Sequence, residues 1–356
     1  MARDARAATR DAPTPTSHTA LTAALGARLE RACLTRIIQE GGTVETRRIG
    51  SLEVSVVGLG CNNFGRRLDA AATATVVSAA LDAGVNHFDT ADLYGQGASE
   101  EFLGRALGRR RREAVIATKF GHERSTFGRG ARPDHVRRAL EGSLRRLGTD
   151  YVDLYWLHQP DPATPIADTL GALDELVKAG KVREIGCSQF SAEQLREAEA
   201  AVRAGAARFV AVQNQYSLLH REPERDDVLA ECERLGLAFV PFFPLASGML
   251  TGKYRRGQPI PQGSRLSEGG GYAELLNERN LDIIEELVRF AESRGHTLLE
   301  LAFAWLLARP TVASVIAGAT KPEQVRANAA AAEWHLTDAE LAEVDAITAA
   351  LEGRAA

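Results

Sequence analysis

Two apolar runs decide the fold of this chain, Ala114-Val115-Ile116-Ala117-Thr118-Lys119 and Tyr151-Val152-Asp153-Leu154-Tyr155-Trp156-Leu157-His158. Their β-branched and aromatic residues predict two buried strands. Between them, Pro133–Leu147 has apolar residues at the helical period and begins with a proline, which favours a helix start. Strand, helix and strand in this order predict a parallel βαβ unit.

The same unit repeats on both sides of this segment. Strands are expected at Val57–Cys61, Asn86–Phe88, Ala114–Lys119, Tyr151–His158, Glu184–Ser188, Phe209–Gln213, Ala238–Pro241 and Val312–Ala317. Helices are expected at Ala70–Ala83, Ser99–Leu107, Pro133–Leu147, Ile166–Lys178, Ala192–Arg203, Glu224–Leu235, Leu281–Arg294 and Pro322–Ala330. Eight strand–helix pairs in strict alternation predict an α/β fold, and favour a closed (β/α)8 TIM barrel over an open sheet.

Other segments are expected to cap this barrel. Thr46–Gly50 and Leu52–Val56 flank a Gly-Ser turn and predict a β-hairpin at the barrel floor. Two helices fall outside the repeat: Leu298–Leu307, which is apolar enough to pack against the barrel wall, and Thr337–Leu351, a C-terminal cover. The Gly-rich connection Ser247–Tyr272 is long enough to serve as a lid over the mouth.

The chain is predicted to form one barrel domain, residues 46–352, after an extension of residues 1–45. The extension is rich in Ala, Arg and Thr, and we expect it to be disordered. Glu40-Gly41-Gly42 can be encoded by a purine-rich ribosome-binding tract. We therefore expect translation to start at Val44, which an intact-mass measurement of the natively expressed protein checks.

Composition narrows the class of protein. Across 356 residues, 45% are hydrophobic and the net charge is −4, which fits a globular protein and gives no electrostatic reason to bind nucleic acid or an anionic membrane. The four cysteines are scattered without metal-ligand spacing, so we expect reduced thiols, no metal centre and a cytoplasmic location. No apolar run is long enough to span a membrane. The oligomeric state is left open.

Ionisable groups follow three successive predicted strands. Asp89 and Tyr94 lie in the run Phe88-Asp89-Thr90-Ala91-Asp92-Leu93-Tyr94-Gly95, Lys119 ends the next strand, and His158 ends the one after. The carboxyl ends of barrel strands meet at one face, where barrel active sites form. There Lys119 is expected to lower the pKa of the Tyr94 phenol, with Asp89 holding the ammonium charged, so that Tyr94 exchanges a proton with a carbonyl oxygen. Taken singly, a packing tyrosine, a structural ion pair and a core histidine are the simpler interpretations.

Residues 46–352 resemble the aldo-keto reductases along their whole length. The motifs that carry the resemblance are Phe88–Glu100, Asp153-Leu154-Tyr155-Trp156-Leu157-His158, Gly186-Cys187-Ser188-Gln189-Phe190, Pro244–Tyr254 and Ile316–Gln324. The resemblance, closest to a bacterial-type subgroup with Gly-Ala-Ser-Glu and Gly-Ala-Thr-Lys signatures, implies that Tyr94 is the general acid. It also implies that Lys119 and Asp89 tune the phenol, that His158 orients the carbonyl, and that a nicotinamide cofactor supplies the hydride.

The resemblance also assigns the cofactor and substrate groups. The implied cofactor-binding residues are Ser188, Gln189, Gln213, Tyr216, Pro244, Leu245, Ala246, Gly248, Lys253, Gly318, Thr320, Lys321, Gln324 and Asn328. Ser188, Gln189 and Gln213 would hold the nicotinamide carboxamide, and Tyr216 would stack on the nicotinamide ring. Pro244–Gly248 would approach the pyrophosphate, and the residues in reach of adenosine would be Lys253, Thr320, Lys321, Gln324 and Asn328. The expected substrate residues are Asn62, Phe64, Tyr94, His122 and His158. Gln189 stands where the family usually has Asn, and Gly318 and Gln324 stand where the best-known members have Lys and Arg. NADP(H) is still favoured as the cofactor, with NAD(H) as the alternative.

Three functions remain open at this stage. The favoured one is NADPH-dependent reduction of small or sugar-derived aldehydes and ketones to alcohols. The polar, partly basic rim around Asn62, Asn63, His122, Arg124 and Arg129 suits hydroxylated or phosphorylated aldehydes, although these charges also have the simpler interpretation of solvating loops. The alternatives are an NAD(P)-dependent sugar or polyol dehydrogenase that works oxidatively, and a cofactor-sensing regulatory protein like the channel β subunits related to this family.

Overall fold

The computed structural model describes residues 44–267 and 273–352. The expected N-terminal extension, residues 1–45, thus lies outside the described residues except for Val44 and Glu45. The end of the predicted lid also lies outside them. No helix within the described ranges is long and apolar enough to cross a membrane.

Eight parallel strands form the centre of the fold, in the order β10-β3-β4-β5-β6-β7-β8-β9. They are β3 Val57–Gly60, β4 His87–Asp89, β5 Val115–Phe120, β6 Val152–Leu157, β7 Val182–Ser188, β8 Phe209–Gln213, β9 Ala238–Phe239 and β10 Val315–Gly318. The two edges meet through parallel bridges that pair Phe239 with Val312 and Phe242 with Ile316. The Phe239 N–H donates to the Thr311 carbonyl over 2.7 Å at this seam. The predicted (β/α)8 barrel is therefore confirmed.

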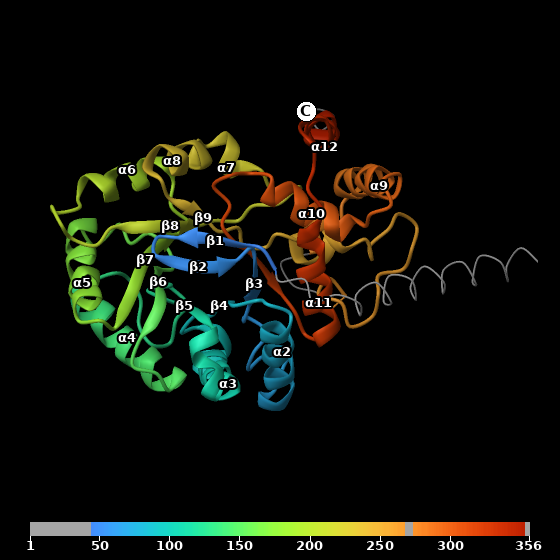
Figure 1. Cartoon of the computed structure of the whole chain (residues 1–356). Coiled ribbons are helices and arrows are strands. Elements are labelled where there is room, and N and C mark those ends of the chain that lie inside the picture. The colour runs from blue at the N-terminus through green and yellow to red at the C-terminus, as the bar shows by residue number, and fades with distance from the viewer. Residues whose placement is uncertain (1–43, 268–272, 353–356) are drawn as a thin grey trace, which may run out of the picture. The chain divides into compact units, whose positions relative to one another are not determined.

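Helices surround the strands on the outside (Figure 1). They are α2 Ala70–Asp82, α3 Ala98–Leu107, α4 Pro133–Leu147, α5 Ile166–Lys178, α6 Ala192–Ala200, α7 Glu222–Arg225, α8 Val228–Leu235, α9 Glu278–Glu292, α10 Leu298–Leu307, α11 Pro322–Ala330 and α12 Asp338–Glu352. Short 3-10 turns lie at η1 Tyr94–Gly97, η2 Gly108–Glu113, η3 Ala246–Thr251, η4 Ala273–Leu275 and η5 Ala331–Glu333. The helix expected at 224–235 is two helices, because Asp227 takes a left-handed conformation with φ 57°.

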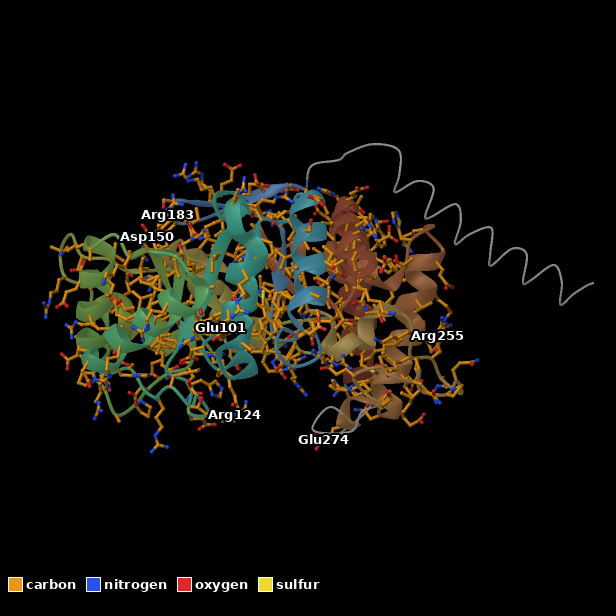
Figure 2. All side chains as sticks on the ribbon, turned by 90° about the horizontal axis from the view of Figure 1, so that it is seen from below. Glu101, Arg124, Asp150, Arg183, Arg255 and Glu274 are labelled. Atoms are coloured by element: carbon orange, nitrogen blue, oxygen red, sulfur yellow. The ribbon has the colours of Figure 1, made fainter. Side chains whose placement is uncertain are left out.

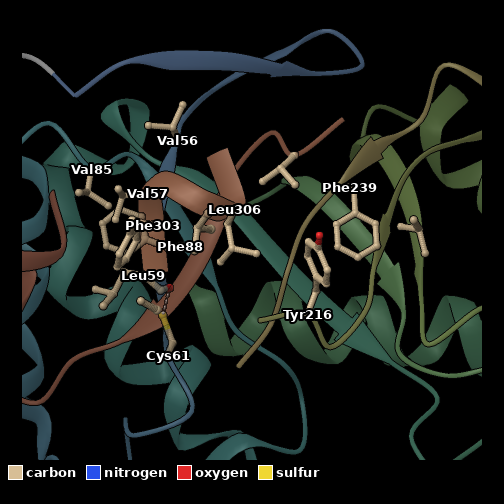
Figure 3. Close-up of a cluster of buried hydrophobic side chains, with 14 of the residues drawn as sticks. Val56, Val57, Leu59, Cys61, Val85, Phe88, Tyr216, Phe239, Phe303 and Leu306 are labelled. Atoms are coloured by element: carbon tan, nitrogen blue, oxygen red, sulfur yellow. Dashed lines mark hydrogen bonds between the residues drawn. The ribbon is translucent and has the colours of Figure 1, made fainter. Parts of the chain in front are cut away.

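The seventh repeat differs from the sequence prediction. The sequence analysis places 281–294 in the repeat and treats Leu298–Leu307 as outside it. In the structure α10 contacts β10 and η3, whereas α9 packs against α10 and α12. Phe303 and Leu306 of α10 lie among the barrel-side chains Val57 and Phe88 (Figure 3). The two helices outside the repeat are therefore α9 and α12, because α10, apolar except for Glu300, is the one that must be buried.

The hairpin of β1 (Thr46–Ile49) and β2 (Leu52–Ser55) closes the barrel floor, as predicted. Ile49, Leu52 and Val54 are buried in one apolar cluster with the interior residues Leu154 and Trp156 of β6. Arg47 fixes the hairpin to the wall, where its guanidinium donates to the carbonyls of Val312 at 2.7 Å and Leu307 at 3.0 Å. The floor is thus sealed by apolar packing, and the site can lie only at the opposite end.

Candidate active site

The four ionisable groups that the sequence singled out converge at the mouth of the barrel. Asp89 ends β4 and Tyr94 opens η1 directly after it, while Lys119 lies in β5 and His158 follows β6. Parallel pairing of Asp89 with Ala117, and of Lys119 with Trp156, brings the three strand ends level. The mouth lies opposite the floor: Asp150 and Arg183 mark the hairpin end of the barrel, and Arg124 and Glu274 mark the other end (Figure 2).

Lys119 is the centre of this cluster. Its side chain is 1% exposed. The ammonium forms an ion pair with the Asp89 carboxylate, donates to the Thr90 carbonyl at 2.8 Å, and lies 3.5 Å from the Tyr94 hydroxyl. The Gln213 amide donates to the other Asp89 oxygen at 3.0 Å. A buried ammonium without partners would be costly, so the pair with Asp89 is what permits a positive charge next to the phenol.

The electrostatics of Tyr94 differ from the sequence expectation. Burial raises the pKa of the Tyr94 phenol, and the positive charge of Lys119 opposes this without overcoming it, so that the net pKa lies above its usual value. For Lys119, burial lowers the pKa, but the attraction of Asp89 and Tyr94 outweighs it, so the net pKa is raised. The site therefore pairs a protonated phenol with a charged ammonium at neutral pH, an arrangement suited to donating a proton.

His158 lies beside the phenol and is held neutral. Its ring is edge-on to the Tyr94 ring at a centroid distance of 6.1 Å and to the His122 ring at 4.8 Å. Burial, followed by the charge of Lys119, holds the pKa of His158 well below its usual value. Its buried Nδ1 has no hydrogen-bond partner among the described residues. A buried, neutral ring with an unused polar atom is ready to bond a polar group of a ligand.

The expected carboxamide-binding residues lie next to this cluster. Ser188 ends β7 and is 1% exposed, while Gln213 ends β8 and is 2% exposed. Gln189 has a left-handed backbone, φ 62°, and its amide donates to the His158 carbonyl at 3.0 Å. Gln189 and Gln213 are thus already bonded to this cluster. The longer side chain of Gln189 holds the His158 backbone in place.

Tyr216 does not lie where the sequence analysis expected it. Its side chain is 0% exposed, packs against Phe239 and Trp305, and donates its hydroxyl proton to Glu224 (Figure 3). A side chain buried in the core cannot stack on a ring at the mouth, so that prediction is wrong. Phe242 is the aromatic at the seam between β9 and β10, and it is partly exposed. Phe242 lies two residues before Pro244, where the motif Pro244–Tyr254 begins, and this position was the signal that the sequence analysis missed.

The loop after β9 makes a tight turn beside a cation. Ala246, Ser247 and Gly248 are three successive residues with positive φ, of 43°, 58° and 97°. The Ala246 and Gly248 N–H groups donate within this turn, to the Phe243 carbonyl at 2.9 Å and the Leu245 carbonyl at 2.8 Å. A Cβ atom on Gly248 would lie 3.0 Å from the Lys253 ammonium, so a cation stands directly beside the loop. Pro244 and Leu245 begin the loop and Lys253 follows η3, which places these predicted phosphate residues together.

The expected adenosine residues lie around the start of α11. Lys321 is the N-cap residue, and the Gln324 side chain accepts from the Thr320 backbone N–H at 2.7 Å. Gln324 thus holds the turn, and Asn328 is 6% exposed, so little of its side chain is open to a ligand. A Cβ at Gly318 would lie 3.3 Å from the Asn63 amide, so a side chain there would require Asn63 to shift slightly.

The expected substrate residues divide into two groups. His122 lies against His158, and Asn62 is partly exposed. Phe64 is 0% exposed and belongs to the outer core, so its predicted contact with substrate is wrong. Its apolar ring is needed between the strands and helices rather than at the rim. Within residues 44–267 and 273–352, no group of three or more His, Cys, Asp or Glu side chains is placed to hold a metal ion.

Comparisons with known proteins agree with this geometry. The sequence profile described as "Aldo/keto reductase family" matches residues 56–349. The chain is 34% identical over 314 residues to an NADP(+) aldo-keto reductase, yakc, of Schizosaccharomyces pombe (85% of this chain, 91% of the relative). It is 33% identical over 321 residues to the L-glyceraldehyde 3-phosphate reductase of Escherichia coli K12 (85% and 92%).

A channel subunit and a solved structure are also similar. The chain is 37% identical over 274 residues to a probable voltage-gated potassium channel subunit beta of rice, Oryza sativa subsp. japonica (74% of this chain, 83% of the relative). The structure of the glycerol dehydrogenase AKR11B4 from Gluconobacter oxydans superposes with a TM-score of 0.74 at 32% identity (86% of this chain, 95% of that chain). The barrel is therefore shared with a protein whose structure was described as a glycerol dehydrogenase.

Proposed function

The chain belongs to the aldo/keto reductase family of NAD(P)H-dependent oxidoreductases, and we propose that it reduces small polar aldehydes to alcohols with Tyr94 as the proton donor. One observation carries this proposal: the buried Lys119 ammonium joins Asp89 to the Tyr94 hydroxyl at the barrel mouth. A reduced carbonyl carbon leaves an alkoxide oxygen that must be protonated. Tyr94 supplies that proton, and Lys119 stabilises the phenolate that remains.

The neighbouring groups orient the carbonyl. His158 is neutral, so it donates a hydrogen bond to the carbonyl oxygen without placing a second positive charge beside Lys119. The edge-on contact with His122 limits how its ring can turn. Asp89, held by both Lys119 and Gln213, keeps the ammonium pointed at the phenol. The two protein groups that face the oxygen are thus fixed before substrate arrives, which lowers the reorganisation needed in the reaction.

The residues present fit a dinucleotide cofactor. The Lys253 ammonium beside the tight turn at 246–248 suits a pyrophosphate, and the N-terminus of α11 suits a further phosphate. When bound, a reduced nicotinamide supplies the hydride. Lys321 at the start of α11 supports a preference for the 2′-phosphate of NADPH. Quenching of protein fluorescence should show tighter binding of NADPH than of NADH, and the reverse order would contradict the preference.

The substrate class follows from the loop that carries His122. Arg124 is exposed beside that histidine, and its charge contributes to the lowered pKa of both His158 and His122, after burial in each case. A guanidinium beside the carbonyl-binding histidine favours an aldehyde that also carries an anionic group. The likeness to an L-glyceraldehyde 3-phosphate reductase supports phosphorylated three-carbon aldehydes in particular.

Replacing Arg124 tests this substrate class. Arg124→Gln should raise the KM for glyceraldehyde 3-phosphate about tenfold, because a charge-assisted contact to phosphate is lost, and should leave the KM for unphosphorylated glyceraldehyde nearly unchanged. Arg112→Gln, an exposed arginine before β5 at the floor end, is the matched control and should change neither value. Equal changes in KM for both aldehydes would show that Arg124 does not recognise the phosphate.

Replacing Tyr94 tests the reaction itself. Tyr94→Phe should lower kcat for aldehyde reduction by about 10²–10⁴-fold, because the proton donor is removed, while the dissociation constant of NADPH stays the same. Initial rates with a panel of aldehydes, and with polyols in the oxidative direction, measure this. A wild-type protein that binds NADPH but turns over no substrate in either direction would contradict the proposal and favour the cofactor-sensing alternative.

A further inference from the structure

A second buried carboxylate lies next to the catalytic cluster and takes no part in it. Asp92 follows Asp89 in the turn that leads to Tyr94, and it is 0% exposed. The Ser125 hydroxyl donates to one of its carboxylate oxygens at 3.0 Å. The other oxygen is buried without a hydrogen-bond partner among the described residues. An asparagine would fill this place without the cost of a buried charge, so the carboxylate needs an explanation.

The bond from Ser125 connects Asp92 to the loop between β5 and α4. This loop, residues 121–132, also carries His122 and Arg124. It is internally tied, because the Ser125 N–H donates to the His122 carbonyl at 2.9 Å and the Arg124 N–H donates to His122 Nδ1 at 3.1 Å. A displacement of Ser125 would therefore also displace His122, which packs against His158.

A second contact holds the same loop from the outside. The Phe127 ring lies under the Arg146 guanidinium at 4.2 Å, and the Phe127 N–H donates to the Ser125 hydroxyl oxygen at 3.3 Å. Arg146 in turn donates to the buried Glu100 at 2.6 Å. Phe127 itself remains 42% exposed. The loop is also tied at its end, where the Ala131 N–H donates to Asp161 at 2.7 Å. Among these attachments, Asp92 is the one that lies beside the catalytic turn.

We propose that Asp92 is a positioning residue: through Ser125 it anchors the 121–132 loop to the catalytic turn, and so holds His122 and Arg124 over the substrate. This rests on the reductase function proposed above, because the aldehyde is what the anchored loop meets. Lys119 is held by β5 itself, and Tyr94 is held in its turn by the bond from its N–H to the Ala91 carbonyl at 3.1 Å. Loss of the anchor should therefore affect binding of the aldehyde far more than the proton transfer.

The surroundings of Asp92 make this anchor sensitive to pH. Burial first, and then the nearby Glu100 of α3, raise the pKa of Asp92 to about 7; the Ser125 bond, the Leu93 backbone and Arg146 of α4 oppose this. Tyr155 of β6 also faces the group, and its phenol is itself kept protonated by burial. The Asp92 carboxylate therefore gains a proton as the pH falls through neutrality. A carboxylate accepts the Ser125 proton more strongly than a carboxylic acid does.

Kinetics against pH test the anchor. In the wild type, the KM for glyceraldehyde 3-phosphate should rise by about fivefold as the pH falls from 8 to 6, because the charge-assisted bond weakens. Asp92→Asn should have the higher KM at pH 8 and lose this pH dependence, with kcat and the dissociation constant of NADPH little changed. Ser125→Ala should behave in the same way, and Ser125→Thr, which keeps the hydroxyl, should restore the wild-type profile.

Limited proteolysis tests the loop without any turnover. Arg124 and Arg129 are exposed trypsin sites within it. Asp92→Asn and Ser125→Ala should speed cleavage at these sites several-fold, and Ser125→Thr should not. If cleavage rates and the KM profile stay at wild-type values in both loosened variants, the proposal is overturned. If cleavage speeds up but the wild type reduces no aldehyde, the anchor stands and the proposed function fails.

Discussion

The two ends of β4 show how differently this barrel treats buried titratable groups. At the floor end, burial lowers the pKa of His87 to about 4, so the ring is neutral, and its Nδ1 forms a hydrogen bond with Ser314 Oγ at 3.0 Å. At the mouth end, Asp89 is charged and paired with Lys119. Along β4, a neutral histidine with a neutral partner thus lies at the floor end, whereas a buried ion pair lies at the mouth end. The strand is only three residues long, so this contrast arises from its surroundings and not from the backbone.

Breaking the ion pair at the mouth should have the largest effect. Lys119→Met leaves Asp89 buried without a cation, so the free energy of unfolding should fall by about 3–5 kcal/mol. The phenol also loses the adjacent positive charge, so kcat should fall by about 10²–10⁴-fold. Urea unfolding and single-turnover rates with NADPH measure the two effects.

A double variant separates chemistry from stability at this site. Asp89→Asn combined with Lys119→Met removes both charges, so most of the lost stability should return while kcat stays low. If the double variant recovers activity together with stability, Lys119 acts only as a structural partner of Asp89 and has no part in the proton transfer.

Removing apolar packing at the floor should have an intermediate effect, which lowers stability and leaves catalysis unchanged. Ile49 of β1 is 0% exposed and packs within the cluster that seals the barrel. Ile49→Ala should lower the free energy of unfolding by about 2–5 kcal/mol through lost burial and a cavity. Because the mouth does not depend on the hairpin, KM and kcat of the remaining folded protein should stay at wild-type values. A change in either would show that the floor and the mouth are coupled.

The same contrast explains what the sequence could predict. Strand–helix alternation fixed the barrel, and the charges at the strand ends located Asp89, Lys119, Tyr94 and His158, because parallel strands bring their ends to one face. The pKa of Tyr94 was misjudged, since the extent of burial, which here exceeds the effect of Lys119, is a tertiary property.

Residues in the irregular loops after strands were harder to place from the sequence. Tyr216 and Phe64 come after strands and are aromatic, as a ligand contact would be, yet both are fully buried. Whether such a ring turns to the mouth or to the helices depends on loop conformation, which residue type does not specify. Asp92 was passed over for a similar reason, because its partner Ser125 lies far along the chain in a loop that no pattern places beside it.

Replacing Asp92 by asparagine should have the smallest effect on stability, and it should increase stability. Its folded-state pKa of about 7 lies above the ordinary value of 3.8, so the folded state resists losing this proton. The resulting penalty is absent at acid pH, grows as the pH rises from about 4 to about 7, and is complete above that. Asp92→Asn should therefore raise the melting temperature at pH 8 by roughly 2–4 °C and change it little at pH 4.

The exposed Asp82 is the control for this expected rise in melting temperature. The hydrogen bond from Arg110 holds the pKa of Asp82 below its usual value, so Asp82→Asn should lower the melting temperature slightly or leave it unchanged at pH 8. If Asp92→Asn raises both the melting temperature and the KM, the mouth keeps a buried charge that favours substrate binding at the expense of stability. This result would agree with the contrast between the two ends of β4. Lower stability of Asp92→Asn at pH 8 would mean that the buried carboxylate is a net structural asset, and the contrast between the two ends would not extend to this residue.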